Sequence, residues 1–450
     1  MEKMKYCPRF NEHLDVDNYE GDVCMCNWIS PGANIIGNLM TDDIDKIYNS
    51  NYANYLRSTM DDQSFKLCNK DACPYLQNDS LEIIEPDEYQ NRKKTSYSPD
   101  SINIAYDFVC NQSCETCRKE VFKPPSDYGI KMRTIHSKIS PYLNNAKRIS
   151  ASGHGDPFAS KYIMEVLENL HPQRADLELG LETNGVFLDE EHWARIEHLS
   201  TVQLHVLVTT NSFDEFTYKH ISRGGDYKRI MRNLRFISRL RENGNIDELS
   251  HALVIQDRNF REIPSFIKRS FSDYAFDKVV LRPVYQWRNM DSDVYWFKDV
   301  LNPCHPYHEE YLEIMQDPSL QDERVYKWGG DMLHDARPYP GAGVILSVAF
   351  PYNLITKGSK IIIYGACGAI GREFQRQIME SQYCEVVGLI DRSGDNSTVM
   401  TPDYLTRLSA DSYDRIILAT KSTVAQDAMK QVLKEAAVED ERIICLEERI

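Results

Sequence analysis

The chain has 450 residues, of which 42% are hydrophobic and 27% charged, with a formal net charge of −16 and twelve cysteines. This length predicts two to three domains. The acidic balance, without a compensating Lys/Arg cluster, argues against nucleic-acid and membrane-surface partners. No apolar run reaches the roughly 18 residues of a membrane helix, and the first residues lack a secretion signal. We therefore expect a cytoplasmic protein whose cysteines bind metal rather than form disulfides.

The first predicted domain, residues 1–78, is rich in cysteine. Its cysteines, together with the segments 36–39 and 47–50, resemble the auxiliary iron–sulfur domain of the SPASM or twitch type. The resemblance implies a cluster that accepts an electron from a substrate radical or holds the domain together. Four thiolates suit a structural zinc ion equally well, so the metal stays open. The expected ligands are Cys7, Cys26, Cys68 and Cys73, with Cys24 as an alternate.

A polar linker over residues 79–100 precedes a regular alternation of strand and helix patterns. Helical spacing recurs at 158–170 and 227–242, between strand candidates. Such alternation predicts an α/β fold with parallel strands and crossover helices. Reactive groups then gather at the carboxyl ends of the strands. The six strand candidates are 102–109, 148–152, 177–183, 202–209, 249–255 and 278–285.

Cys110, Cys114 and Cys117 follow the first of these strands with the spacing C-x3-C-x2-C and no fourth cysteine nearby. Three thiolates can hold three irons of a four-iron cluster and leave one iron open, since fully ligated clusters take four cysteines. The motif and its place resemble the radical SAM superfamily. The resemblance implies a partial (βα)6 TIM-like barrel over residues 101–335, and S-adenosylmethionine (SAM) bound at the open iron of a 4Fe–4S cluster. It implies that SAM is cleaved to a 5′-deoxyadenosyl radical, which abstracts a hydrogen atom from a substrate. A three-cysteine zinc site is the alternative.

Three further motifs match that superfamily. A glycine-rich turn after the second strand is similar to the Gly-Gly-Glu-Pro-like turn that holds the methionyl amino group. A Thr-Asn-Gly sequence ends the third strand, and an Arg-Gly-Gly sequence has an arginine that meets the SAM carboxylate in relatives. An ordinary turn and a solvated arginine are the alternatives. The implied cofactor-binding residues are Gly153, Gly155, Asp156, Pro157, Thr183, Asn184 and Arg223.

After a second linker, residues 336–357, the segment 358–450 forms a compact α/β unit. A buried-strand run leads into a glycine-rich turn and a helix, and a second strand ends at an aspartate. Such glycines let a helix N-terminus face a phosphate, and the acidic residue can bind a ribose. The G-x2-G-x2-G spacing is similar to that of sugar-nucleotide epimerase-like domains and predicts a Rossmann-like domain. We expect this domain to bind a nucleotide or sugar nucleotide. The alternative is a purely structural or dimerising role. The residues concerned are Gly365, Gly368, Gly371 and Asp391.

These patterns favour a radical SAM oxidoreductase or epimerase acting on a small or carrier-bound substrate, possible substrates including a sugar or sugar nucleotide. Cys304 lies beyond the last strand. We expect it either to donate a hydrogen atom in an epimerisation or to be a structural cysteine without a catalytic role. A radical SAM/SPASM peptide-modifying maturase and a non-catalytic nucleotide-binding scaffold are the alternative functions. Because SAM cleavage is reductive, we expect an electron donor such as flavodoxin or ferredoxin as a partner.

Overall fold

The computed structural model describes residues 3–29, 33–70, 73–77, 79–94, 96–285, 290, 292–302, 305–327, 350–395, 397–420 and 422–446. By its internal contacts the chain divides into two compact units. The first comprises Met1–Cys26, Ile36–Arg57 and Lys70–Ile345, and the second comprises Asn27–Ile35, Ser58–Asn69 and Leu346–Ile450. Cys304 and most of the predicted second linker lie outside the described residues.

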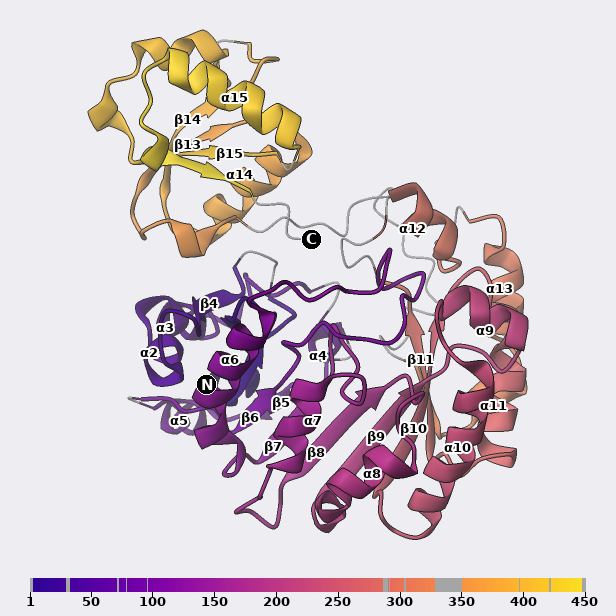
Figure 1. The fold of residues 1–450 in the computed structure, drawn as a ribbon. Coiled ribbons are helices and arrows are strands. Elements are labelled where there is room, and N and C mark those ends of the chain that lie inside the picture. Colours follow the sequence, from indigo (N-terminus) through magenta and orange to yellow (C-terminus); the bar gives the residue numbers. More distant parts are fainter. Residues whose placement is uncertain are drawn as a thin grey trace. The chain divides into compact units, whose positions relative to one another are not determined.

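A ten-stranded sheet is the framework of the first unit (Figure 1). Its strand order is β12-β11-β10-β9-β8-β7-β6-β2-β3-β4. The neighbours from β12 to β2 pair in parallel, whereas β3 runs antiparallel to β2. The predicted strands thus appear in order as β6 to β11, and β12 follows them. The strands are β2 (His13–Val16), β3 (Asp22–Cys24), β4 (Ile35–Asn38), β6 (Ser101–Asn103), β7 (Arg148–Ala151), β8 (Glu178–Thr183), β9 (Gln203–Thr209), β10 (Glu248–Ile255), β11 (Lys278–Pro283) and β12 (Val325–Lys327).

The first predicted strand, 102–109, is shorter in the structure than expected. β6 ends at Asn103, and Ile104 N still donates to Ser150 O at 2.8 Å. Beyond it, Asp107 Oδ1 accepts from Val109 N at 2.8 Å. This local side-chain turn competes with the ladder and diverts the chain toward the cysteines.

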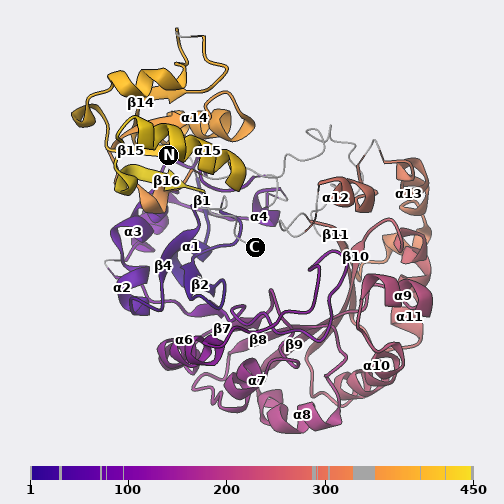
Figure 2. The same ribbon diagram turned by 45° about the horizontal axis from the view of Figure 1, so that its top comes forward.

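The crossover helices cover one side of the sheet (Figure 2). Ser160, Asp189 and Asp226 cap three of them by accepting from backbone N–H groups of the first turn. Such caps satisfy donors that have no partner within a helix. The helices are α6 (Tyr128–Leu143), α7 (Lys161–Glu168), α8 (Glu190–Ile196), α9 (Glu215–Ile221), α10 (Tyr227–Glu242) and α11 (Ile263–Ser272), followed by α12 (Ser292–Lys298) and α13 (His308–Ile314).

The two faces of the central strands differ in exposure. In β8 and β9, the side chains toward the helices are buried, among them Leu181 and Val206. The alternate residues are partly or fully exposed, among them Glu182 and His205. Central strands of parallel sheets are usually covered on both faces. The described residues therefore leave a polar face of this sheet accessible.

The cysteine-rich N-terminal segment shares the sheet of the barrel. β2 pairs with β6 in the register Leu14↔Ile102, and His13 Nδ1 lies 2.8 Å from Ser101 Oγ. The ring of Tyr19 packs edge-on against Phe108 with 5.2 Å between centroids. Contact between this segment and the barrel, which the sequence left to inference, is therefore direct.

The remaining elements of the N-terminal part surround this junction. β1 pairs with β5 in an antiparallel arrangement. The predicted linker 79–100 contains β5 and α5, because Pro86 starts a helix at its first turn, where no N–H donor is needed. These elements are β1 (Met4–Tyr6), α1 (Arg9–Glu12), α2 (Ile44–Tyr48), α3 (Asn51–Ser58), α4 (Pro74–Gln77), β5 (Glu82–Ile84) and α5 (Pro86–Asn91).

The C-terminal part of the second unit contains a parallel four-stranded sheet in the order β14-β13-β15-β16. The chain reverses its direction of travel across the sheet at β13, since β14 and β15 flank that strand. Ile362, Ile416 and Leu433 are fully buried in its core. No described helix of the chain is both long and apolar enough to cross a bilayer. The elements are β13 (Lys360–Tyr364), α14 (Ala369–Ser381), β14 (Glu385–Ile390), β15 (Arg415–Leu418), α15 (Thr423–Glu435) and β16 (Ile443–Cys445).

Candidate functional site

The three motif cysteines lie in a short loop, residues 110–117, that we call the cysteine loop. Its backbone is held by the segment after α9: Ser113 N donates to Arg223 O and Glu115 N donates to Ile221 O, both at 2.9 Å. Within the loop, Cys117 N donates to Cys114 O at 2.9 Å. The loop is thus fixed beyond the carboxyl end of β6, where a parallel sheet gathers its reactive groups.

The thiols of the cysteine loop influence one another. Burial, together with the nearby Asp156 carboxylate and the Cys117 thiol, raises the pKa of Cys110 to about 12. Burial also raises the pKa of Cys114, and the thiols of Cys110 and Cys117 act in the same direction. The Arg118 guanidinium donates a hydrogen bond to the Cys117 thiol and lies near the thiols of all three cysteines. Neighbouring buried thiols need a cationic partner to ionise, which an iron–sulfur cluster supplies, so this donor set fits one.

Among the described residues, no group of three or more His, Cys, Asp or Glu side chains is arranged to hold a single metal ion. Each cysteine of a four-iron cluster binds a different iron, so its ligands need not converge on one point.

Asn184, at the end of β8, reaches the cysteine loop. Its Nδ2 lies 3.7 Å from Cys110 Sγ and donates to Asn111 Oδ1 at 2.9 Å. Its own Oδ1 accepts from Val186 N at 3.0 Å, which fixes the orientation of the amide. The structure therefore brings the predicted residues Asn184 and Cys110 together.

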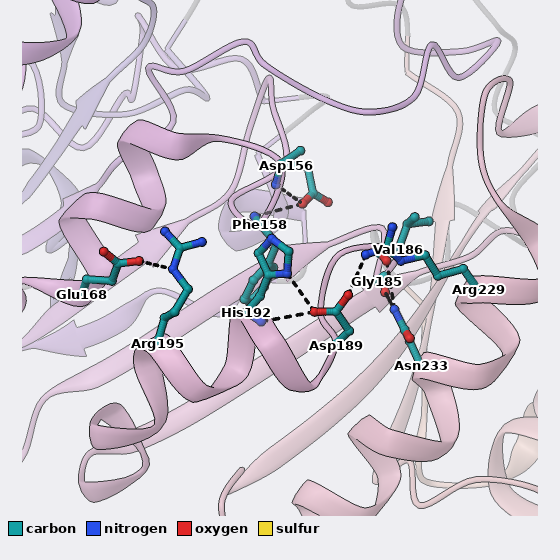
Figure 3. A network of polar contacts seen from close by, with 11 residues as sticks. Asp156, Phe158, Glu168, Gly185, Val186, Asp189, His192, Arg195, Arg229 and Asn233 are labelled. Carbon is teal, nitrogen blue, oxygen red and sulfur yellow. Dashed lines mark hydrogen bonds and ion pairs between the residues drawn. The ribbon is translucent and has the colours of Figure 1, made fainter.

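Asp156 connects the turn after β7 with the end of β8. It is 3% exposed. One carboxylate oxygen accepts from Phe158 N (Figure 3) and from Ala159 N. The other accepts from Thr183 Oγ1 and Asn184 N, both at 2.8 Å. Burial raises the pKa of this carboxyl group, against the effect of these hydrogen bonds. A carboxylate has about four acceptor sites, and all four are used. This favours a positioning role for Asp156 over the direct ammonium contact expected from the sequence.

The glycines of this turn allow it to pack closely on the segment that precedes the cysteine loop. A Cβ on Gly155 would lie 2.3 Å from Asp107 O, and one on Gly153, whose φ is +141°, would lie 2.5 Å from Ala105 Cβ. Pro157 is buried beside them. Only glycine fits at these two positions, so the turn and the cysteine loop are positioned together.

Arg223 holds the cysteine loop with its side chain as well as its backbone. Its Nε donates to Ser113 O and its Nη2 donates to Arg118 O, both at 2.8 Å. The contact of Arg223 with a SAM carboxylate stays a prediction. Gln112 and Arg118 are functional candidates that the sequence prediction missed. Gln112 accepts from Cys114 Sγ at 3.2 Å, and Arg118 donates to Phe108 O at 2.7 Å; their places within and beside the motif were the available signal.

A second network fixes the loop between β8 and α8. Asp189 accepts from His192 N and Nδ1, and from Arg229 Nη2 at 2.6 Å. Asn233 donates to the carbonyls of Gly185 and Val186 (Figure 3). The turn that carries Asn184 is therefore braced by α8 and α10.

Three N-terminal cysteines, Cys7, Cys24 and Cys26, lie near Arg9, and Cys73 lies near Cys7. Burial, together with the neighbouring Cys73 thiol, raises the pKa of Cys7 to about 11. Burial also raises the pKa of Cys24, and the nearby Cys26 thiol acts in the same direction. The Cys26 thiol also raises the pKa of Arg9. Cys68 belongs to the second unit, where it bridges to Ile29, and its place relative to the other four stays a prediction.

The glycine-rich turn of the C-terminal part has the expected close packing. A Cβ on Gly371 would lie 2.2 Å from Gly365 O, and Gly365 has φ of +95°. Gly368 precedes α14 as its N-cap. Asp391 Oδ2 accepts from Cys367 N at 3.0 Å. That carboxylate thus contacts the turn itself, and the nucleotide-binding roles of these residues stay predictions.

Comparisons with known proteins agree with the site. Residues 108–268 match the Radical SAM superfamily, and residues 7–74 match the SPASM iron–sulfur cluster-binding domain. No curated protein matches the chain.

The solved structures that are similar to parts of the chain include the following two. "Native anSMEcpe with bound AdoMet and Cp18Cys peptide" has 17% identity and a TM-score of 0.29, over 50% of this chain and 61% of that one. HydG, a maturase of the FeFe-hydrogenase, has 11% identity and a TM-score of 0.30, over 46% of each chain. The chain therefore spans less than two thirds of either protein. By its family matches, the chain carries a radical SAM domain and, N-terminal to it, an iron–sulfur cluster-binding SPASM domain.

Proposed function

We propose that this protein is a radical SAM enzyme that holds a 4Fe–4S cluster through Cys110, Cys114 and Cys117 and abstracts a hydrogen atom from a small or carrier-bound substrate. The observation that carries the proposal is the contact of Asn184 with Cys110, which joins the cysteine loop to the end of β8. Asp156 extends this connection to the turn after β7. Three consecutive strand ends thereby support one site.

A 4Fe–4S cluster held by Cys110, Cys114 and Cys117 would supply the electron for the reductive cleavage of SAM. The chain's own residues fix the geometry: Arg223 holds the loop carbonyls, and Asn184 orients the loop at Cys110. Arg118 supplies a positive charge beside the three thiols. These contacts favour a rigid loop, which a cluster with one open iron needs to keep its ligands.

The SPASM domain supports a second cluster, which we assign to Cys7, Cys26, Cys68 and Cys73. The Arg9 guanidinium interacts electrostatically with Cys26 and lies 4.0 Å from Asp15 Oδ2. Its positive charge would offset the charge of the thiolates. An auxiliary cluster that accepts an electron from the substrate radical would make the net reaction an oxidation.

The accessible face of the central sheet is the place we propose for the substrate. At its carboxyl end, Arg282 of β11 pairs with Glu182 of β8 across the two intervening strands. Carboxylate and guanidinium groups recognise polar, hydrogen-bonding ligands such as the hydroxyl and phosphate groups of a sugar nucleotide. The glycine-rich turn before α14 supports the same substrate class. A peptide-modifying maturase is the competing function, which the SPASM match supports equally.

Anaerobic reconstitution tests the central claim. The wild-type chain should hold about eight irons, from two four-iron clusters. C110A/C114A should hold about half and form no 5′-deoxyadenosine from SAM, while the control C445A, altered in β16, should match the wild type. SAM cleavage at the wild-type rate in C110A/C114A would refute the proposal.

The substrate class is tested separately. Transfer of deuterium from a labelled sugar nucleotide into 5′-deoxyadenosine would support the sugar assignment. Transfer from a labelled peptide only, with no binding of UDP- or GDP-sugars to the full chain in calorimetry, would support the maturase.

A further inference from the structure

The first unit contains a buried cation that no motif predicts. Lys298, the last residue of α12, is only 4% exposed. An ammonium group removed from water is costly unless it is paired. Its side chain therefore marks a place where the fold requires a positive charge.

Two carboxylates pair with this cation. Lys298 Nζ lies 2.9 Å from Glu115 Oε2 and 3.1 Å from Asp257 Oδ1. The contact with Glu115 is an ion pair rather than an aligned hydrogen bond, since Oε2 has no hydrogen-bond partner among the described residues. Asp257 N also donates to Lys298 O at 3.1 Å. Arg258 lies 3.5 Å from the same Glu115 oxygen and is more exposed.

The position of Glu115 gives this network its meaning. Glu115 lies in the cysteine loop, directly after Cys114 and two residues before Cys117. Its backbone N–H donates to Ile221 O at 2.9 Å. Its side chain therefore adds a second anchor for the same residue. Through Lys298 and Asp257, this anchor ties the loop to α12 and to the end of β10.

We propose that Lys298 is a positioning residue for the cysteine loop and that its charge makes the cluster held there easier to reduce. This rests on the proposed function, because it requires a cluster at that loop. Reduction adds a negative charge, which a buried cation stabilises and a carboxylate opposes. Lys298 and Glu115 therefore act on the midpoint potential of the cluster in opposite directions.

The test uses the full chain, reconstituted anaerobically, with potentials measured by EPR-monitored redox titration. The cluster at the cysteine loop is the one whose EPR signal changes when SAM is added. K298M should shift its potential to more negative values and retain less iron after gel filtration. E115Q should shift the potential to less negative values, and K298R should stay close to wild type. The control K219M breaks an exposed ion pair with Glu215 on α9 and should change neither quantity.

Wild-type potentials in both K298M and E115Q overturn the proposal, and so do shifts in the same direction. A K298M variant that loses only thermal stability, with wild-type potential and iron retention, also overturns it. If K298M does not fold, E115Q decides, and a wild-type potential in E115Q refutes the role. The variant C110A/C114A separates the two claims. If it still shows a SAM-responsive EPR signal, the proposed function is wrong. If it loses that signal while K298M and E115Q keep the wild-type midpoint potential, only the role of Lys298 is wrong.

Discussion

The amide nitrogen of Asn184 lies 3.7 Å from the thiol of Cys110, although 74 positions separate the two residues in the chain. Asn184 directly follows β8, and Cys110 begins the loop that follows β6, two strands away in the sheet. Because parallel strands bring their carboxyl ends to one edge, the fold converts this sequence distance into a contact. The contact predicts that Asn184 influences the cysteine loop directly.

We expect Asn184→Ala to weaken the cysteine loop without unfolding the barrel. The substitution removes the bond to Asn111 and the contact with Cys110, while Asp156 keeps its backbone donors. A lost hydrogen bond of about 1 to 1.4 kcal/mol corresponds to roughly five- to tenfold slower SAM cleavage if it acts on the transition state. Iron content and 5′-deoxyadenosine formation are the measurements. Asn243→Ala, at the exposed end of α10, is the control, and equal rates in both variants would contradict the prediction.

Gly155→Ala should destabilise the protein strongly. Its Cβ would lie 2.3 Å from Asp107 O and 2.7 Å from Val109 O, and both atoms are backbone. Overpacking of this kind costs about 1 to 3 kcal/mol or more. Gly180→Ala in β8 is the matched control, since the nearest atom to its Cβ is 3.9 Å away. The free energy of unfolding in urea decides, and a Gly155→Ala value within error of Gly180→Ala would refute the close packing of this turn.

Asp189 should contribute to stability above about pH 4. Burial raises its pKa, but hydrogen bonds from His192 and Arg229 outweigh burial and bring the pKa to about 2. Because the folded pKa is lower than the unfolded one, this stabilisation is complete above the unfolded pKa and is lost as the pH falls from about 4 to 2. A shift of this size corresponds to about 2 kcal/mol at neutral pH. Asp189→Asn should lose this amount at pH 7 and little of it near pH 2, as measured by urea unfolding. The control Asp427→Asn, at an exposed position of α15, should show no such difference. A pH-independent loss in Asp189→Asn would contradict the cause.

The order of the strands was predictable because each carries a local strand pattern, which alternates between apolar and other residues in β8 and is more continuously apolar at the end of β10. The motif residues Cys110 and Asp156 were predictable for a similar reason: their spacing is local. What the sequence did not indicate are the partners. Nothing in the pattern around Asp156 shows that Thr183 and Asn184 use up one of its oxygens.

Two further features depend on contacts that are distant in the sequence. The pairing of β2 with β6 joins residues about ninety positions apart, so the N-terminal segment was predicted as a separate domain although its strands β2 and β3 belong to the sheet of the barrel. Lys298 ends a short helix for which the sequence predicted no function, and its role follows from Glu115, more than 180 positions earlier. Such long-range ion pairs leave no periodic signal in a single sequence.

His251 of β10 should make the protein less stable below about pH 6.5. The side chain is fully buried, with Nε2 2.9 Å from Thr210 Oγ1 and Nδ1 2.8 Å from Ser270 Oγ. Its ring stacks on Phe276 with 4.2 Å between centroids. Burial lowers the pKa of His251 well below its ordinary value. The folded imidazole therefore stays neutral where the unfolded one takes up a proton.

Because the unfolded state binds the extra proton, this contribution to stability is present above pH 6.5 and is lost progressively as the pH falls below it. The slope approaches about 1.4 kcal/mol per pH unit. His251→Gln should be less stable than wild type at pH 8, since it loses the stacking on Phe276, and the difference should narrow between pH 6.5 and 5. Urea unfolding across this range measures it, with the exposed His220→Gln as the control. A difference between wild type and His251→Gln that stays constant from pH 8 to pH 5 would show that His251 is protonated equally in the folded and unfolded states.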